Sequence, residues 1–154
     1  MVLPLLIAAQ ISTGPLPAGQ QTPSADFVAS VLAPIHGLFR AFEAGDRDAM
    51  ARLVYPEGRV TATGQRASGS ELRQMSWTQF AQRVTPNSRF SESISDPAIK
   101  VDGDVAMVWA PFVVRVNGKV ANCGIDHFDL TRENGAWKVM NLTFSSRTTE
   151  CPAE

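Results

Sequence analysis

Two Asn-Gly pairs, at residues 117–118 and 134–135, limit the fold of this 154-residue chain more than any other feature. Asn-Gly is the preferred pair in a two-residue type I′ turn, which joins neighbouring antiparallel strands. The segments on both sides of each pair alternate apolar and polar residues, as β-strands do. We therefore predict a meander of three antiparallel strands over residues 105–144.

The two turns also predict which side chains share a face of the sheet. Counting outward from each turn places Trp109 opposite Asp126, and Asp126 opposite Thr143. One face then collects Val105, Met107, Trp109, Phe128, Leu130, Trp137 and Val139, with Asp126, Asn141 and Thr143 as a polar island. The other face collects Val108, Ala110, Phe112, Ile125, His127, Met140, Leu142 and Phe144. A slip of one residue would exchange these faces.

Helices are predicted before the meander. Residues 26–45, "DFVASVLAPIHGLFRAFEAG", carry apolar residues at helical spacing, with Gly45 suited to the C-terminal cap. Pro34 is expected to kink this helix or divide it in two. Asp46 fits the N-cap of a second, short helix that Pro56 closes.

The segment between these helices and the meander combines a strand, a loop and a third helix. Residues 58–64 have the alternation of a strand, and residues 65–74 indicate an exposed loop. Ser76 and Gln79 have capping-box spacing, which predicts a helix over residues 77–84. From Pro86 onward the pattern is that of strands. Helices followed by an antiparallel sheet favour the α+β class, with a cone-like layout.

Two stretches carry a family resemblance: "LFRAFEAGDRDAMARLVYPEGRVTATG" and "VDGDVAMVWAPFVVRVNGKVANCGIDHFDLTRENGAWKV". They resemble the nuclear transport factor 2-like superfamily, in particular its exported bacterial members of unknown function and its SnoaL-like and ketosteroid-isomerase-like group. The resemblance covers about residues 27–148. It implies a cone-shaped half-barrel, with helices packed on a curved, mainly antiparallel sheet and a deep pocket between them. It implies no single reaction, because the family includes isomerases, dehydratases, cyclases, hydrolases and binding proteins.

Two hypotheses concern such a pocket. In the first, a small apolar molecule binds without chemistry, and Asp126 is a structural hydrogen-bond acceptor. The residues expected to line the pocket are Tyr55, Trp77, Phe80, Trp109, Trp137, Asn141 and Thr143. In the second, Asp126 is a catalytic general base with a pKa raised by partial burial beside Trp109, and Tyr55 or Asn141 donates to an oxyanion. The sequence leaves open whether the protein is an enzyme.

A third hypothesis is an interaction module. The second apolar face of the meander needs a cover, which a symmetric homodimer would supply. The expected interface residues are Phe112, Ile125, His127, Met140, Leu142 and Phe144. Asp126 and His127 are sequence neighbours, so they lie on opposite faces and are not expected to act as a pair.

The N-terminal 25 residues differ from the rest of the chain, because they contain no charged side chain. Residues 2–9 form an apolar run too short to span a bilayer, and a Pro-, Gly- and Ser-containing stretch follows. We interpret residues 1–25 as an export signal or a disordered tail, and residues 26–154 as the domain. No Lys or Arg precedes the apolar run, which leaves a cytoplasmic tail as the alternative.

The two cysteines, Cys123 and Cys151, fit periplasmic or secreted export, since they form a disulfide in an oxidising compartment. Two reduced thiols are the alternative. For a disulfide to form, the chain must turn back within residues 147–151, because Cys123 is expected near Ser146.

Composition argues against several other partners. The net charge is −1, and no stretch of Lys and Arg forms the stripe that nucleic-acid binding requires. Ligand spacing for a metal ion and a Gly-rich loop for phosphate are also missing. We expect no cofactor, no metal ion, no nucleic acid and no stable membrane span.

Overall fold

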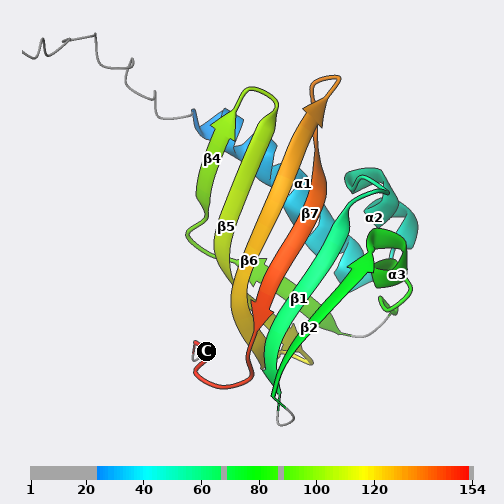
Figure 1. Ribbon diagram of the computed structural model, residues 1–154, viewed down its shortest axis with the longest axis vertical. Helices are drawn as coiled ribbons and strands as arrows, with labels where there is room; N and C mark the ends of the chain where they lie inside the picture. The colour runs from blue at the N-terminus through cyan, green and yellow to red at the C-terminus, as the bar shows by residue number, and fades with distance from the viewer. Residues whose placement is uncertain (1–23, 67–68, 87–88, 153–154) are drawn as a thin grey trace, which may run out of the picture.

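The computed structural model describes residues 24–66, 69–86 and 89–152. The helices are α1 (Ala25–Ala44), α2 (Arg47–Leu53) and α3 (Trp77–Ala81). The strands are β1 (Arg59–Arg66), β2 (Gly69–Ser76), β3 (Phe90–Ile94), β4 (Ala98–Asp102), β5 (Val105–Val116), β6 (Lys119–Glu133) and β7 (Ala136–Ser146). They form one curved sheet in the order β2-β1-β7-β6-β5-β3, and β4 also pairs with β5 (Figure 1). The predicted α+β cone is confirmed.

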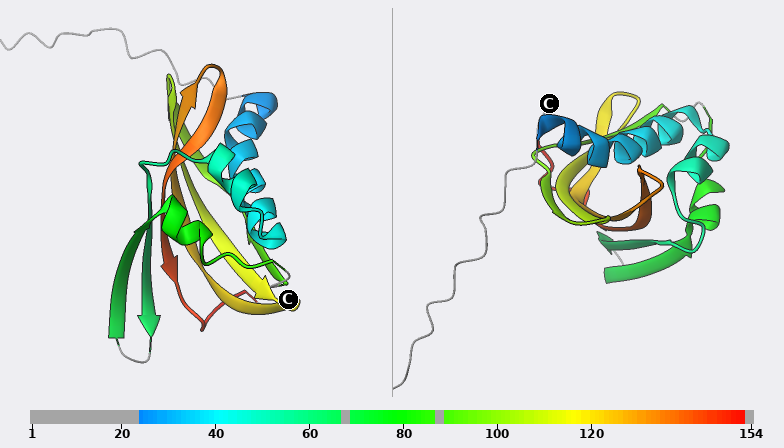
Figure 2. Two further views of the ribbon diagram at one scale, coloured as in Figure 1. Left: turned by 90° about the vertical axis from the view of Figure 1, so that its right-hand side faces the viewer. Right: turned by 90° about the horizontal axis from the view of Figure 1, so that it is seen from above.

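Helix α1 lies across the concave face of the sheet (Figure 2). The Ser24 hydroxyl accepts from the Phe27 N–H at its start, and Gly45 ends it with a left-handed φ of 69°. Contrary to the expected division, the helix continues through Pro34, because the apolar face around that residue is held against the sheet. By length and composition α1 could span a membrane, but Ile35 and Leu38 are fully buried, as in the core helix of a domain.

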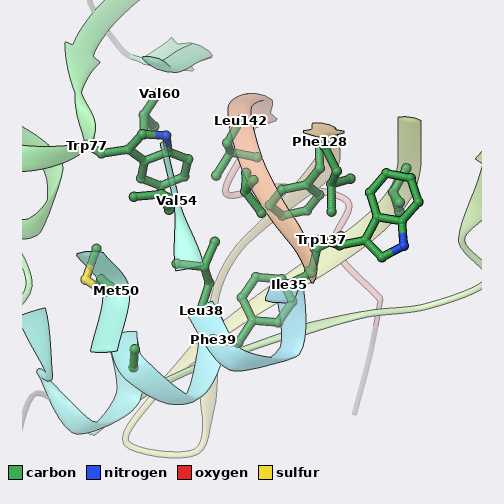
Figure 3. Close-up of a cluster of buried hydrophobic side chains, with 14 of the residues drawn as sticks. Ile35, Leu38, Phe39, Met50, Val54, Val60, Trp77, Phe128, Trp137 and Leu142 are labelled. Atoms are coloured by element: carbon green, nitrogen blue, oxygen red, sulfur yellow. The ribbon is translucent and has the colours of Figure 1, made fainter. Parts of the chain in front are cut away.

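The core fills the space between the helices and the concave face of the sheet (Figure 3). Its labelled members are Ile35, Leu38, Phe39, Met50, Val54, Val60, Trp77, Phe128, Trp137 and Leu142. Phe39 of α1 contacts Phe128 of β6 edge-on, with ring centroids 6.2 Å apart. Each large side chain buried here contributes roughly 1.5–3 kcal/mol. The concave face under the helices is therefore packed with apolar side chains.

Two helix predictions hold and one loop prediction is wrong. Asp46 caps α2, and Ser76 and Gln79 form the predicted capping box of α3. Helix α3 ends at Ala81, earlier than expected, and a tight turn follows it. Of the predicted loop over residues 65–74, residues 65–66 belong instead to β1 and residues 69–74 to β2, and the two strands pair antiparallel. Strand β2 is polar because it is an edge strand, and polar side chains protect such edges from pairing with other chains.

Both Asn-Gly turns are present, since φ is positive at Asn117 and Gly118 and at Asn134 and Gly135. The predicted register holds only close to each turn. Between β5 and β6, Arg115 pairs with Val120 but Val114 pairs with Asn122, which leaves Ala121 of β6 as an extra residue.

A second irregularity interrupts the pairing of β6 with β7. Leu130 pairs with Val139 but Asp129 pairs with Asn141, which leaves Met140 as an extra residue. Beyond the two bulges each partner strand is displaced by one residue.

The displacement corrects several predicted neighbours. Trp109 pairs with His127, not with Asp126, and Asp126 pairs with Ala110 and Phe144. Val105, Met107, Trp109, Asn141 and Thr143 therefore lie on the outer face, whereas Val108, Ala110, Phe112, Leu142 and Phe144 lie on the concave face. The concave placement of Asp126, Phe128, Leu130, Trp137 and Val139 is confirmed.

The disulfide between Cys123 and Cys151 is confirmed, with Cα atoms 5.6 Å apart. Cys123 pairs through two backbone hydrogen bonds with Arg147, one residue beyond the predicted position, and the chain then turns back at Glu150. Closing a loop with a sequence separation of 28 residues stabilises the domain by roughly 3–4 kcal/mol.

Candidate functional site

Asp126 is the one polar residue in the buried core of the described chain, with 1% of its surface exposed. Neither of its carboxyl oxygens has a hydrogen-bond partner within the described residues. Its cross-strand neighbours, Ala110 and Phe144, are apolar. The Phe144 ring meets Phe112 nearly perpendicularly, at 6.1 Å between centroids. A buried carboxyl group thus lies among apolar side chains.

The backbone beside Asp126 explains how this arrangement is packed. A Cβ atom at Gly124 would clash with the carbonyl oxygen of Ser145 and would lie 2.9 Å from the Phe112 ring. Only glycine lets the ring and strand β7 approach β6 this closely. Gly124 therefore helps to seat the aromatic ring near the carboxyl group.

Burial raises the pKa of Asp126 to about 8. A carboxyl group with this pKa is mainly protonated at pH 7, so it donates a hydrogen bond and also accepts one. A pKa near the working pH is also what proton transfer requires, so the general-base role of Asp126 stays a prediction.

A second carboxyl group, Glu92 of β3, lies near Asp126. Glu92 pairs with Val114, whose side chain is buried on the concave face. Although part of the residue reaches the surface, burial of the carboxyl group raises its pKa well above the ordinary value, and the charge of Asp126 raises it further. The concave face of the sheet therefore holds two carboxyl groups that resist ionisation together.

A hollow of about 620 Å³ is lined mainly by residues of β1, β2, β6 and β7. We call the end of the sheet where β1, β2 and β7 extend past the helices the open end of the cone (Figure 1). The residues that line the hollow are Ala62, Thr63, Gly64, Glu71, Arg73, Ala121, Asn122, Phe144, Ser146, Arg147 and Thr148. Arg73 forms an ion pair with Glu71 at 3.6 Å, and the Asn122 amide donates to the Ser146 hydroxyl at 2.8 Å. Phe144 forms part of its wall and is also the cross-strand neighbour of Asp126, so the hollow lies next to the strand pair that carries the buried carboxyl group.

Four predicted pocket residues lie away from this site. The Tyr55 hydroxyl donates to Glu133 at 3.5 Å, near the other end of β6. The Asn141 side chain is engaged by the Arg59 N–H and by Asp129. Trp109, 49% exposed, lies with Thr143 on the outer face. The bulges explain the positions of Trp109, Asn141 and Thr143, because they turn the predicted faces over; Tyr55 lies in the loop after α2.

The other predicted aromatic residues belong to the helical side. Phe80 packs on Phe42, with ring centroids 5.3 Å apart, and Trp137 contacts Phe27 edge-on at 6.4 Å. Trp77 lines a separate hollow between α2 and α3. The predicted set is therefore not one pocket.

The predicted interface residues are also divided between the two faces. Phe112 and Leu142 are buried on the concave face, and Phe144 packs beside them, so these three do not lie on the outer face. Ile125 and His127 are on the outer face, as predicted, where the ring of His127 lies 5.9 Å from that of Trp109. Met140 is the extra residue of the second bulge.

Sequence reasoning missed Glu92, although a signal was present. Phe90, Glu92 and Ile94 alternate as one face of a strand, and the first and third are apolar. A carboxylate in the middle of such a series predicts a buried acid.

Within the described ranges, no cluster of three His, Cys, Asp or Glu side chains is arranged to hold a metal ion.

The comparisons with known proteins agree with this architecture. A family model described as "Putative lumazine-binding" matches residues 26–145. The chain belongs to that family. Many solved structures are similar to it in fold, and several are nuclear transport factor 2-like proteins of unknown function. The resemblance seen in the sequence is thus confirmed. No protein with a curated description matches the chain.

Three solved structures illustrate the similarity of this lumazine-binding-like domain. A protein of unknown function with a cystatin-like fold from Nostoc punctiforme has a TM-score of 0.65 and 11% identity, over 82% of this chain and 95% of that one. A nuclear transport factor 2-like protein from Silicibacter pomeroyi has a TM-score of 0.59 and 19% identity, over 82% of this chain and 100% of that one. A nuclear transport factor 2-like superfamily protein from Salmonella enterica has a TM-score of 0.55 and 19% identity, over 80% of this chain and 93% of that one. At these identities the similarity establishes the fold alone.

Proposed function

We propose that this nuclear transport factor 2-like domain binds a small ring-shaped molecule at the open end of its cone. The observation that carries the proposal is Asp126, a buried carboxyl group that lacks a hydrogen-bond partner in the described part of the chain. Leaving such a group unsatisfied costs about 1–3 kcal/mol, and native proteins contain few of them. A ligand that bonds to Asp126 would offset this cost.

The protonated state of Asp126 suggests the chemistry of the ligand. A neutral carboxyl group presents one donor and one acceptor side by side. A cyclic amide presents the complementary pair, an N–H next to a C=O, along one edge of its ring. The rings of Phe112 and Phe144 supply apolar contact for the ring faces. A planar heterocycle with a lactam edge satisfies both requirements.

The ligand would enter through the hollow of about 620 Å³. Its ring lies against Phe144, and its lactam edge reaches Asp126 when the Phe144 side chain turns aside. Lumazine, a pteridine with lactam groups, is the first probe, and the name of the matching family supports this choice.

The experiment is calorimetric titration of the full chain with lumazine at pH 7. Asp126→Asn keeps a donor and an acceptor, so we expect it to bind within a few-fold of the unchanged chain. Asp126→Leu removes both, and we expect affinity to fall by about tenfold or more, as for the loss of a buried hydrogen-bonded pair. Asp102→Asn, at an exposed position in β4, is the control. Equal affinity of the Leu variant, or no binding by the unchanged chain, would contradict the proposal.

We also propose that the chain works outside the cytosol. The support is the disulfide Cys123–Cys151, because cytosolic thiols are kept reduced. The predicted signal or tail lies almost wholly in residues 1–23, which are outside the described residues. Fractionation of the producing cells tests this, and recovery of the chain only in the cytosol, with two free thiols, would contradict it.

A homodimer through the outer sheet face is the third part of the proposal. That face exposes Trp109 and Val105, at 49% and 59% of their surfaces. Large apolar side chains exposed on a sheet face are typical of a surface that another chain covers. Its test belongs to the whole molecule and is described in the Discussion.

A further inference from the structure

A second hollow is lined by residues of α2 and α3 and of the segments next to them. The two helices lie side by side at the edge of the sheet (Figure 1). The volume of the hollow is about 240 Å³. It is lined by Arg47, Met50, Ala51, Val54, Pro56, Trp77, Thr78, Ala81 and Gln82. It shares no residue with the hollow at the open end of the cone. The two hollows are therefore separate sites.

The walls of this α2–α3 hollow are apolar and firmly held. Met50, Val54 and Trp77 are 1%, 5% and 3% exposed, so each is anchored in the core (Figure 3). The Trp77 indole N–H donates to the Met140 carbonyl at 2.9 Å, which fixes the ring against β7. Gly58 permits this bond, because a Cβ atom there would clash with the same carbonyl. The indole is thus positioned in advance as a wall for an apolar ring.

Arg47 is the charged residue of the lining. One guanidinium nitrogen, Nη2, donates to the Gln82 and Val84 carbonyls at 3.4 and 3.3 Å. These contacts hold the guanidinium beside the hollow. The remaining guanidinium nitrogens make no hydrogen bond to the described residues, so they can bind an anion. A guanidinium group binds carboxylates in a planar, two-bond geometry.

The size of the hollow selects the ligand. A dry cavity of about 150 Å³ is enough to bind benzene. The α2–α3 hollow therefore accommodates one benzene ring with a short substituent. We propose that it is a second binding site, specific for a small aromatic carboxylate, with the ring against Trp77 and the carboxylate on Arg47.

Benzoate is the probe, and nuclear magnetic resonance of the ¹⁵N-labelled full chain is the measurement. We expect saturable shifts of the Trp77 indole signal and of backbone signals in α2 and α3. Benzyl alcohol, which has the ring without the charge, should cause the same shifts at higher concentration. Benzoate shifts confined to other parts of the chain would overturn the proposal.

Two variants test separately how the aromatic ring and the carboxylate charge of the probe contribute to binding. Arg47→Gln should weaken benzoate about tenfold, the loss of a charge-assisted pair, and leave benzyl alcohol unchanged. Ala51→Phe should fill the hollow from an exposed helix position and abolish the binding of benzoate and of benzyl alcohol. If Arg47→Gln binds benzoate as tightly as the unchanged chain, the assignment of the carboxylate is wrong. If Ala51→Phe still binds, the hollow is not the site.

The lumazine titration keeps this proposal distinct from the first one. Asp126→Leu should leave benzoate binding unchanged, and Ala51→Phe should leave lumazine binding unchanged. Arg47→Lys guards against a merely structural effect, because it keeps the charge and should recover part of the benzoate affinity. If Ala51→Phe keeps its fold but binds neither benzoate nor lumazine, the two sites are not separate.

Discussion

The buried acid at position 126 makes stability depend on pH. Its pKa is about 8 in the folded chain, against an ordinary value of 3.8. Between these values the unfolded chain loses the proton while the folded chain keeps it, so stability falls as pH rises from about 4 to about 8. The shift corresponds to an upper limit of roughly 6 kcal/mol. The pKa of Glu92 is also raised above its ordinary value, so this residue changes stability with pH in the same direction.

We predict that Asp126→Asn reduces this dependence. An amide does not ionise, so one of the two contributions disappears, whereas the Glu92 contribution remains and weakens without its charged neighbour. Urea unfolding at pH 5 and pH 8 measures the effect: the unchanged chain should lose stability between the two, and the variant should lose less. Asp102→Asn should behave as the unchanged chain. Parallel losses in both variants would show that Asp126 is not the titrating group.

At the scale of the elements, the two bulges decide which side chains meet. The Asn-Gly turns predicted both hairpins, and near them the pairing was right, as with Leu130 and Val139. Ala121 and Met140 look like ordinary strand residues, so nothing in the sequence marked them as extra. Because side chains alternate, each bulge turned the distant half of a strand over. Asp126 was placed correctly because it shares its own strand with Phe128 and Leu130, but its partners were not.

The same close packing predicts a strong effect at Gly124. Gly124→Ala should destabilise the domain by about 2 kcal/mol or more, because the new Cβ meets the Ser145 carbonyl, which is backbone and cannot move aside. Gly37→Ala is the matched control. Its Cβ meets the flexible end of Leu53, and alanine favours the helix by up to about 1 kcal/mol. Chemical denaturation compares the two, and equal stabilities would contradict the described approach of β6 and β7.

At the scale of the whole molecule, the sheet has one face covered by α1 and one face open. The second apolar face of the predicted meander led us to expect a dimer, and the bulges change which residues that face exposes. Trp109 takes the place of Phe112, Leu142 and Phe144, which the fold uses inside the cone. The outer face therefore carries fewer apolar residues than the sequence indicated.

We predict that the unchanged chain sediments as a dimer at micromolar concentration. Trp109→Glu should shift it to a monomer, because the charge would be buried without a partner in the interface. Ala44→Glu, at an exposed position of α1 on the opposite side of the sheet, is the control and should remain dimeric. A monomeric unchanged chain would remove the dimer from this account.

The ¹³C signal of the Asp126 carboxyl group, followed from pH 5 to pH 9 with and without lumazine, tests the central claim most directly. The account predicts a midpoint near pH 8 in the free chain. With saturating lumazine the signal should shift, and its midpoint should rise further, since the bound lactam favours the protonated acid. An Asp126 signal that lumazine leaves unchanged over the whole range would contradict the proposed site.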